Sequence, residues 1–284
     1  MHKPASRTER LLQQRATMLS RGVLMLAMEE LKDSELREIL RSPLVPALEL
    51  LDVQENRLTA TAVQWLVEEP KLRNLRHLAL SGNPIGDAGV QALAAAPFCR
   101  ELTELFLART GLGQEGARAL GGCLRHGRIR FVDAGLQPLS AAASEALSAL
   151  PTERLRLQSI GLDGPTAQKI LQGAACRELD LQNNPLGPGA LTDLPSLSSG
   201  LELIDLSNTG LGAVDAAALA HLQSSRLHSV ILSHCPLGDA GVIALSGAPW
   251  LGQLRLLSVI GSKASPAAFL AIRSAYGARD GLIL

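Results

Sequence analysis

Aromatic residues are scarce in this chain of 284 residues, since Phe, Tyr and Trp together make up only 2%. Hydrophobic residues nevertheless make up 46%, so the core must consist of aliphatic side chains, chiefly Leu, with Ala and Gly allowing close approach. A chain of this length can form one large domain or two ordinary ones. Length alone therefore leaves the number of domains open.

An excess of charge of either sign is also absent, because 27 Lys and Arg balance 27 Asp and Glu. Proteins that bind nucleic acid neutralise phosphates with a surplus of basic residues. We therefore expect no nucleic-acid partner. Only five of the 27 cations are Lys, and this skew, together with abundant Ala, Gly and Leu, leads us to expect a bacterial source.

Long hydrophobic runs and closely spaced cysteines are lacking as well. No apolar run approaches the length of a transmembrane helix, and charges interrupt the N-terminal stretch where a signal peptide would need an apolar core. The four cysteines are Cys99, Cys123, Cys176 and Cys235, and no two of them form a CxxC pair. This spacing favours reduced thiols in a cytoplasmic protein, so we expect neither a disulfide framework nor a zinc site. The lack of a long apolar run leads us to expect no membrane contact.

A repeated phrase is what the sequence does contain. The segment NPIGDAGVQALAAAP at 83–97 recurs as CPLGDAGVIALSGAP at 235–249, with ten of the fifteen positions identical. Aligning the intervening chain on the apolar pattern LxxLxLxxNxL reveals nine units with a period of 23 to 27 residues. The residues at the Asn position are Asn56, Asn83, Thr110, Gln137, Ile160, Asn184, Thr209, Cys235 and Ser262.

These units resemble the leucine-rich repeat family over nearly the whole chain, and the GDAGVQALA phrase resembles its ribonuclease-inhibitor-like class. The resemblance implies an α/β solenoid, a curved horseshoe with a parallel sheet on the concave face and helices on the convex face. We expect residues 1–45 to form an N-terminal helical cap with a degenerate first repeat. Residues 46–284 then form about nine repeats and a partial C-terminal strand.

Each letter of the pattern has a physical reason. LxLxx is a short strand whose Leu side chains point into the core, and Asn can bond backbone groups of adjacent turns that would otherwise be buried unpaired. Ile160 cannot do this, so we expect a local irregularity there. Asp87 and Asp239 are expected to cap the helices that begin at their own GDAG segments.

The two ends need separate treatment. The SRTE segment at 6–9 has the form of a capping box, which predicts a helix near 6–20, a strand near 23–27 and a helix near 33–41. One continuous helix over 6–31 is the alternative. At the other end, Leu282 and Leu284 fall one period after the last complete strand. An open strand edge there would be covered by the preceding loop or by self-association.

Residues that flank the central Leu of each strand point away from the core, so they line the concave face. Phe106 and Phe131 lie on this surface, beside Arg154 and Arg156. Aromatic and Arg side chains are enriched at protein interfaces. The predicted protein-binding residues are Phe106, Phe131, Arg154, Arg156, Asp133, Glu104, Asp180 and Asp205, with Glu178 nearby. The alternative is that both Arg simply pair with neighbouring carboxylates.

No motif for catalysis is present: the sequence contains no GxSxG, Walker or HExxH segment. The sequence therefore predicts a protein that is not an enzyme, binds no cofactor or metal, and acts as a scaffold or adaptor for an unknown protein partner. The alternative function is regulation of a small GTPase or another enzyme, because Ran-type GTPase activators share this repeat class. No residue-specific motif carries that activity to this chain.

Overall fold

The computed structural model describes residues 6–223 and 226–284, which form two compact units divided between Gln137 and Pro138. The predicted boundary after residue 45 is a different kind of division, between cap and repeats, and it stays a prediction. None of the described helices combines the length and the apolar character needed to span a bilayer.

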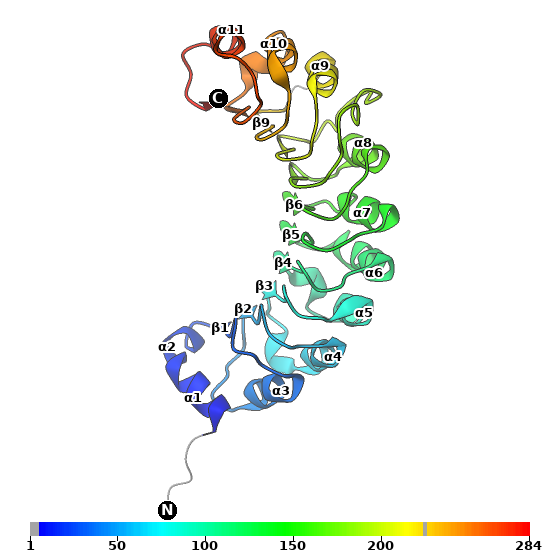
Figure 1. The fold of residues 1–284 in the computed structure, drawn as a ribbon. Helices are drawn as coiled ribbons and strands as arrows, with labels where there is room; N and C mark the ends of the chain where they lie inside the picture. Colours follow the sequence, from blue (N-terminus) through cyan, green and yellow to red (C-terminus); the bar gives the residue numbers. More distant parts are fainter. Residues whose placement is uncertain (1–5, 224–225) are drawn as a thin grey trace, which may run out of the picture. The chain divides into compact units, whose positions relative to one another are not determined.

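The first unit alternates short strands with helices (Figure 1). Its elements are α1 (Arg7–Gln14), α2 (Ala16–Leu19), β1 (Val23–Met25), α3 (Asp33–Arg41), β2 (Leu50–Asp52), α4 (Ala60–Glu68), η1 (Pro70–Leu72), β3 (His77–Ala79), α5 (Gly86–Ala95), η2 (Cys99–Glu101), β4 (Glu104–Phe106), α6 (Gln114–Leu124) and β5 (Phe131–Asp133). The strand at 23–25 excludes the single continuous helix that was the alternative for this region.

The second unit continues the alternation. Its elements are α7 (Ala141–Ser148), β6 (Arg154–Arg156), α8 (Gly164–Gly173), β7 (Glu178–Asp180), β8 (Leu203–Asp205), α9 (Ala213–His221), β9 (Ser229–Ile231), α10 (Gly238–Ser246), η3 (Leu251–Gln253), β10 (Leu256–Ser258), α11 (Pro266–Tyr276) and β11 (Leu282–Ile283). The described residues between β7 and β8 form turns in place of a helix. Pro188 and Pro195 lie in this segment, and Pro lacks the N–H that a helix interior needs.

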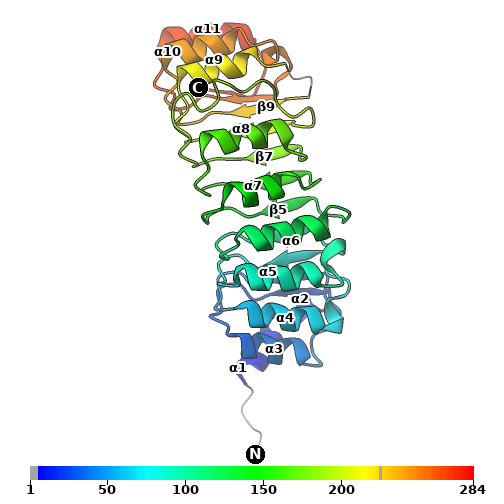
Figure 2. The ribbon, with the colours of Figure 1, turned by 90° about the vertical axis from the view of Figure 1, so that its right-hand side faces the viewer.

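Within each unit the strands pair in parallel and in sequence order, with the central Leu positions aligned. Leu51 pairs with Leu78 and Leu78 with Leu105 in the first unit, and all three side chains are fully buried. Their burial follows from the alternation of a strand, which turns the central residue toward the helices and its two neighbours away from them. Helices α3 to α6 of the first unit, and α7 to α11 of the second, lie in a row on one side of the strands of their unit, whereas α1 and α2 lie beside β1 at the N-terminal end (Figures 1 and 2). The predicted alternation of parallel strands and helices is confirmed.

The Asn positions form a buried amide ladder between neighbouring repeats. Asn83 is fully buried; its Nδ2 donates to the carbonyls of Val53 (2.9 Å) and Leu80 (2.9 Å), and its Oδ1 accepts from the N–H of Leu58 (3.0 Å). Among the substitutes, Gln137 makes the same kind of bonds. Its Nε2 donates to the carbonyl of Leu107 in the preceding repeat (2.8 Å) and to that of Ala134 in its own repeat (3.1 Å). The predicted role of this position is therefore confirmed.

Ile160 departs from the ladder without distorting the backbone. Ser159 has a φ of 54°, the same value as Asn208 at the corresponding turn, so the expected irregularity is not observed. Asn184 of the following repeat makes its usual bonds to this turn, because its Oδ1 accepts from the N–H of Ile160 (2.9 Å) and its Nδ2 donates to Leu157 O (2.9 Å). Toward the preceding repeat, the N–H of Leu139 donates to the backbone carbonyl of Ile160 (3.0 Å) in place of a side-chain amide.

The GDAG aspartates cap the helix of the following repeat, and the prediction that they cap their own helix is wrong. Asp87 lies inside the first turn of α5, and its Oδ1 accepts from the N–H groups of Gly113 (2.7 Å) and Gly116 (2.9 Å) at the start of α6. A Cβ on Gly116 would stand 2.6 Å from that oxygen, so the close approach requires glycine. Asp239 likewise accepts from Ser265 before α11, and this backbone hydrogen bond lowers the pKa of its carboxyl.

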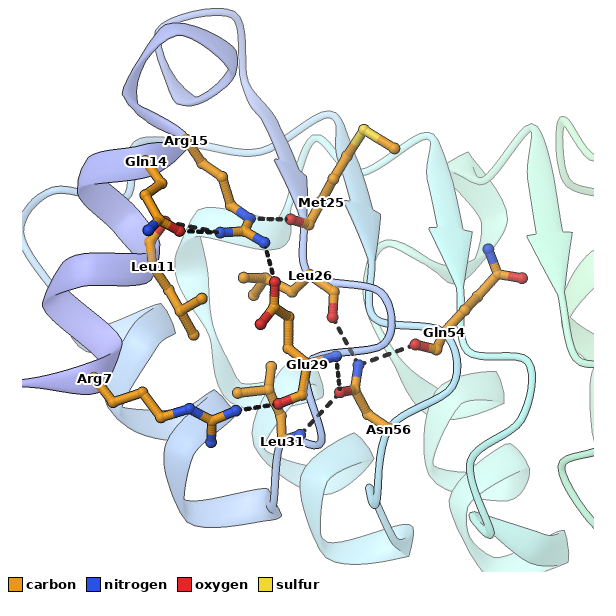
Figure 3. A network of polar contacts seen from close by, with 10 residues as sticks. All are labelled: Arg7, Leu11, Gln14, Arg15, Met25, Leu26, Glu29, Leu31, Gln54 and Asn56. Carbon is orange, nitrogen blue, oxygen red and sulfur yellow. Dashed lines mark hydrogen bonds and ion pairs between the residues drawn. The ribbon is translucent and has the colours of Figure 1, made fainter.

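The N-terminal helices are tied to the first strand by polar contacts (Figure 3). Arg15, after α1, donates from Nε to the carbonyl of Met25 on β1 (2.5 Å) and pairs with Glu29. Asn56 of the next repeat accepts from the N–H of Glu29 (3.1 Å) and donates to the carbonyl of Leu26 (2.8 Å). The helical segment thus satisfies backbone groups at the outer side of β1, which limits its ability to pair with another strand.

The last strand, β11, pairs in parallel with β10, where Leu257 faces Leu282 and Ser258 faces Ile283. The partial strand expected at 282–284 is therefore present. Ile283 is 44% exposed at this edge. Self-association through the edge remains a prediction.

Two of the four cysteines form a disulfide, which contradicts the expectation of four reduced thiols. Cys99 and Cys123 are bonded with their Cα atoms 6.7 Å apart, and both are buried. Their separation of 24 residues is about one repeat, which places them at neighbouring levels of the same stack. Cys176 and Cys235 are free and buried.

We expect Ellman's reagent to find no reactive thiol in the folded protein and two after unfolding without reductant. Burial raises the pKa of the Cys176 thiol to about 12, so it stays protonated and unreactive at neutral pH. The free cysteines, Cys176 and Cys235, are the two thiols expected to appear on unfolding. Four thiols in the unfolded, unreduced protein would show that the bond does not form.

Candidate functional site

The predicted binding residues occupy the outward positions of five consecutive strands. Glu104 and Phe106 flank the central Leu of β4, and Phe131 and Asp133 flank the central Val of β5. Arg154 and Arg156 occupy β6, Glu178 and Asp180 occupy β7, and Asp205 ends β8. The first four residues belong to the first unit and the other five to the second.

The set on the first unit, Glu104, Phe106, Phe131 and Asp133, is termed the aromatic cluster. The rings of Phe106 and Phe131 meet edge to face, with centroids 5.0 Å apart and an interplanar angle of 71°. Such pairs contribute about 0.5–1.5 kcal/mol beyond the area that they bury. Both rings are half-buried, since they lean on each other across adjacent strands while one side stays open. The pair is thus a preformed aromatic surface.

The register of the two strands explains this contact. Phe131 faces Glu104 and Phe106 faces Asp133, so the two rings are diagonal neighbours across one strand pair. Diagonal side chains lie within reach of each other when they are aromatic. Asp133 is buried, and its Oδ1 accepts from the N–H of Gly135 (3.1 Å). Asp133 therefore shapes the end of the strand in addition to facing Phe106.

The set on the second unit, Arg154, Arg156, Glu178, Asp180 and Asp205, is termed the arginine–carboxylate cluster. Arg154 Nε lies 2.5 Å from Glu178 Oε2, and Arg156 Nε lies 3.9 Å from Asp180 Oδ2. The strand register places each Arg opposite its carboxylate. The alternative expectation, that both Arg pair with neighbouring carboxylates, is therefore confirmed. Both Arg side chains nevertheless remain substantially exposed, at 51% and 40%.

Asp180 is the least solvated carboxylate of this cluster, with a side chain only 14% exposed. Burial raises the pKa of its carboxyl, and the neighbouring Asp205 carboxylate raises it further, although the bonds from Gln182 and the charge of Arg156 act in the opposite direction. A carboxylate that is costly to ionise gains from an additional cation. A Lys or Arg from a partner would supply that cation beside Asp180 and Asp205.

A hollow that the residue pattern did not predict lies at the N-terminal end of the first unit. It is a cavity of about 530 Å³ between α1, α3 and α4, lined by side chains that include Arg37, Arg41 and Trp65. The Arg37 guanidinium stands 4.5 Å from the centroid of the Trp65 ring. Trp65 lies half-buried on α4, where it forms one wall of this hollow.

Side chains that could serve as metal ligands are dispersed over the part of the chain that the structure describes. There, no three His, Cys, Asp or Glu side chains come together in a way that could hold a metal ion. The ionic side chains of both clusters are engaged with partners on their own sheet, as the contacts above show. The arrangement is suited to holding another molecule by surface contact.

Comparisons with known proteins agree on the repeat. A family model described as Leucine Rich repeat matches residues 71–94 and 223–246, which include most of the two near-identical phrases. No curated protein matches the sequence.

Several solved structures are similar to the chain. An internalin from Listeria monocytogenes is 14% identical, with 98% of this chain and 93% of that chain covered and a TM-score of 0.41. A chain in the yeast Rad7 and Elc1 complex is 16% identical, with 94% and 75% covered and a TM-score of 0.53. A chain in a TLR13–ssRNA13 complex is 19% identical, with 86% and 33% covered and a TM-score of 0.53. At these identities, the last two similarities establish the fold alone.

Proposed function

We propose that this leucine-rich repeat protein is a non-enzymatic scaffold or adaptor that binds a partner protein on the outward face of its sheet strands. The observation that carries the proposal is the preformed pair of half-exposed rings, Phe106 and Phe131, on strands otherwise occupied by polar and aliphatic residues. Fold alone does not imply function. The proposal rests on these side chains, with the repeat as their support.

The aromatic cluster has the properties of an interface hot spot. Aromatic side chains are enriched in such positions because they bury a large area at low cost in conformational entropy. The rings are held by each other and by the strand register, so binding need not order them. A partner that covers the open side of the pair would remove apolar surface from water without rearranging this protein.

The arginine–carboxylate cluster, on the second unit, would be a polar binding surface in its own right. Its ion pairs lie on the solvent side, where exposed pairs contribute little to stability. A partner carboxylate at Arg156 or a partner cation at Asp180 would gain from charges that the strands already hold in place. We expect the partner surface to be mixed in charge, with an apolar group for the Phe pair.

The class of repeat and the source stay predictions. The period of 23 to 27 residues, with a helix in nearly every repeat, supports the ribonuclease-inhibitor-like class. The predominance of Arg over Lys still leads us to expect a bacterial source. A cytoplasmic location is less well supported than the sequence suggested, because the Cys99–Cys123 disulfide is typical of oxidising compartments.

Quantitative affinity capture from the native host tests the proposal. The bait carrying Phe106→Ala and Phe131→Ala is expected to retain its partner at least about tenfold less than the unaltered chain, since hot-spot truncations cost 2 kcal/mol or more. Gln91→Ala on the helix side is the matched control and should retain the partner fully. Equal retention by all three baits would place binding elsewhere.

A further inference from the structure

The outward faces of the last three helices, α9, α10 and α11, are apolar, unlike those of the helices before them. Buried residues at helical spacing define the inner face of each helix, so the opposite positions are the outward ones. In α10, for example, Val242 and Leu245 are buried, and Ala240 and Ile243 are exposed. The outward residues are Val214, Ala217, Ala218 and His221 in α9, Ala240, Ile243, Ala244 and Gly247 at α10, and Ala267, Leu270, Ala271 and Ser274 in α11.

The contrast is clearest at the central outward position of each repeat. This position holds Gln64, Gln91, Arg118, Glu145 and Gln168 in α4 to α8, and Ala217, Ile243 and Leu270 in α9 to α11. The two near-identical phrases of the sequence differ at this point, where Gln91 in the first copy is replaced by Ile243 in the second. A position that otherwise meets water with a polar side chain has become aliphatic in three adjacent helices.

These aliphatic side chains are well exposed and lie on neighbouring helices. Val214 is 54%, Ile243 52% and Leu270 66% exposed. The three helices pack side by side at the C-terminal end of the second unit, as Figure 2 shows from the helix side. With helices about 10 Å apart and about 15 Å long, the patch spans about 450 Å². That equals the largest apolar patch of a typical monomer, which is often an interaction site.

We propose that this helix face is a homodimer interface, in which α10 of one copy packs antiparallel against α10 of a second copy about a twofold axis. A twofold interface brings a patch against itself, so it must be self-complementary. The outward positions named above carry no Asp, Glu, Lys or Arg, and the exposed Asp239 and Arg273, one turn from Ile243 and Leu270 respectively, lie at opposite ends of the helices, so two copies can meet without like charges in contact. In this arrangement α11 of one copy lies against α11 of the other, so Leu270 faces the Leu270 region of the second copy, and Val214 in the first turn of α9 faces the last turn of the second α9.

The charges at the rim select the antiparallel orientation. Asp239 lies exposed in the first turn of α10, and Arg273 lies exposed in the last turn of α11. Antiparallel packing brings the acidic end of one copy to the basic end of the other, whereas parallel packing would place like charges together. At about 450 Å² per copy, the interface is smaller than the standard 800 Å² per partner, so the dimer is expected to be weak.

Sedimentation velocity over a concentration series tests this inference on the full chain. We expect the unaltered protein to shift from monomer to dimer between about 1 µM and about 1 mM, the range of a small interface. Ile243→Asp should remain a monomer throughout. Gln91→Asp is the matched control, since it places the same charge at the same position of the near-identical repeat, and it should dimerise like the unaltered chain.

A charge-swap mixture gives the sharper result. Because the twofold axis passes near α10, residue 243 of one copy lies near residue 243 of the other. Ile243→Arg and Ile243→Asp should each be monomeric alone and should form a heterodimer when mixed. A monomeric unaltered chain at about 1 mM, or equal dimerisation of Ile243→Asp, would overturn the inference. Dimers that are lost in Ile283→Lys but kept in Ile243→Asp would also overturn the inference, because they would form through the edge of β11.

Discussion

Replacing Asn83 by Ala is expected to lower the free energy of unfolding by about 3 kcal/mol, because it leaves several buried backbone groups unpaired at once. The lost partners are the N–H of Leu58 and the carbonyls of Val53 and Leu80, which belong to two neighbouring repeats. The side chain itself is fully buried, so water cannot replace it without opening the stack. Urea unfolding followed by the fluorescence of Trp65, in the same unit, measures the change.

Asn74→Ala is the control for this prediction. Asn74 is exposed, lies in the same unit as Asn83 and Trp65, and has no positive φ that Ala would strain. Its replacement should change the free energy of unfolding by no more than about 0.5 kcal/mol. Similar losses for the two variants would mean that the buried amide ladder does not hold the repeats together.

Asp215→Ala is expected to destabilise the second unit by about 4 kcal/mol, because three N–H groups, two of them buried, lose the carboxylate that accepts from them. Asp215 is fully buried at the start of α9, and it accepts from the N–H groups of Gly189, Leu191 and Gly212, each at 2.8 Å. The first two lie in the turn that replaces a helix between β7 and β8. One carboxylate thus caps its own helix and holds the irregular segment of the preceding repeat.

The matched control lies in that same turn. Asp193 is exposed, and Asp193→Ala removes the same carboxylate without emptying a buried site, so it should leave the unfolding midpoint nearly unchanged. Trp250, which is buried in the second unit, reports the transition by its fluorescence in urea. If Asp193→Ala and Asp215→Ala unfolded alike, the turn would be held by its own residues.

The sequence predicted best what depends on local periodicity. The strand positions follow from Leu at alternate residues, and the role of Asn83 follows from the need to satisfy buried backbone groups. Prediction failed where a side-chain contact depends on how the helices of neighbouring repeats stack. Asp87 was expected to cap its own helix, but the stacking of helices brings the start of α6 within 2.7 Å of its carboxylate. A single repeat cannot reveal that distance.

The disulfide and the binding surface also depend on contacts between repeats that the sequence alone does not specify. Cys99 and Cys123 have no CxxC spacing, yet a separation of nearly one period was a signal that stacking could bring them together. For the surface, alternation placed Phe106 and Phe131 on one face, but the contact between their rings depends on the strand register. The pairing of Arg154 with Glu178 was foreseen only as an alternative, since composition does not fix which ion pairs form.

Hydroxyl-radical footprinting of the protein with and without its captured partner tests the central claim most directly. Oxidation reports the solvent exposure of individual side chains, on the strand side and on the helix side of the same molecule. We predict that binding protects Phe106 and Phe131 and leaves Gln91 and Trp65, on the helix side of the same unit, unchanged. Protection of the helix side with undiminished oxidation of both Phe rings would contradict the proposal that the sheet face binds the partner.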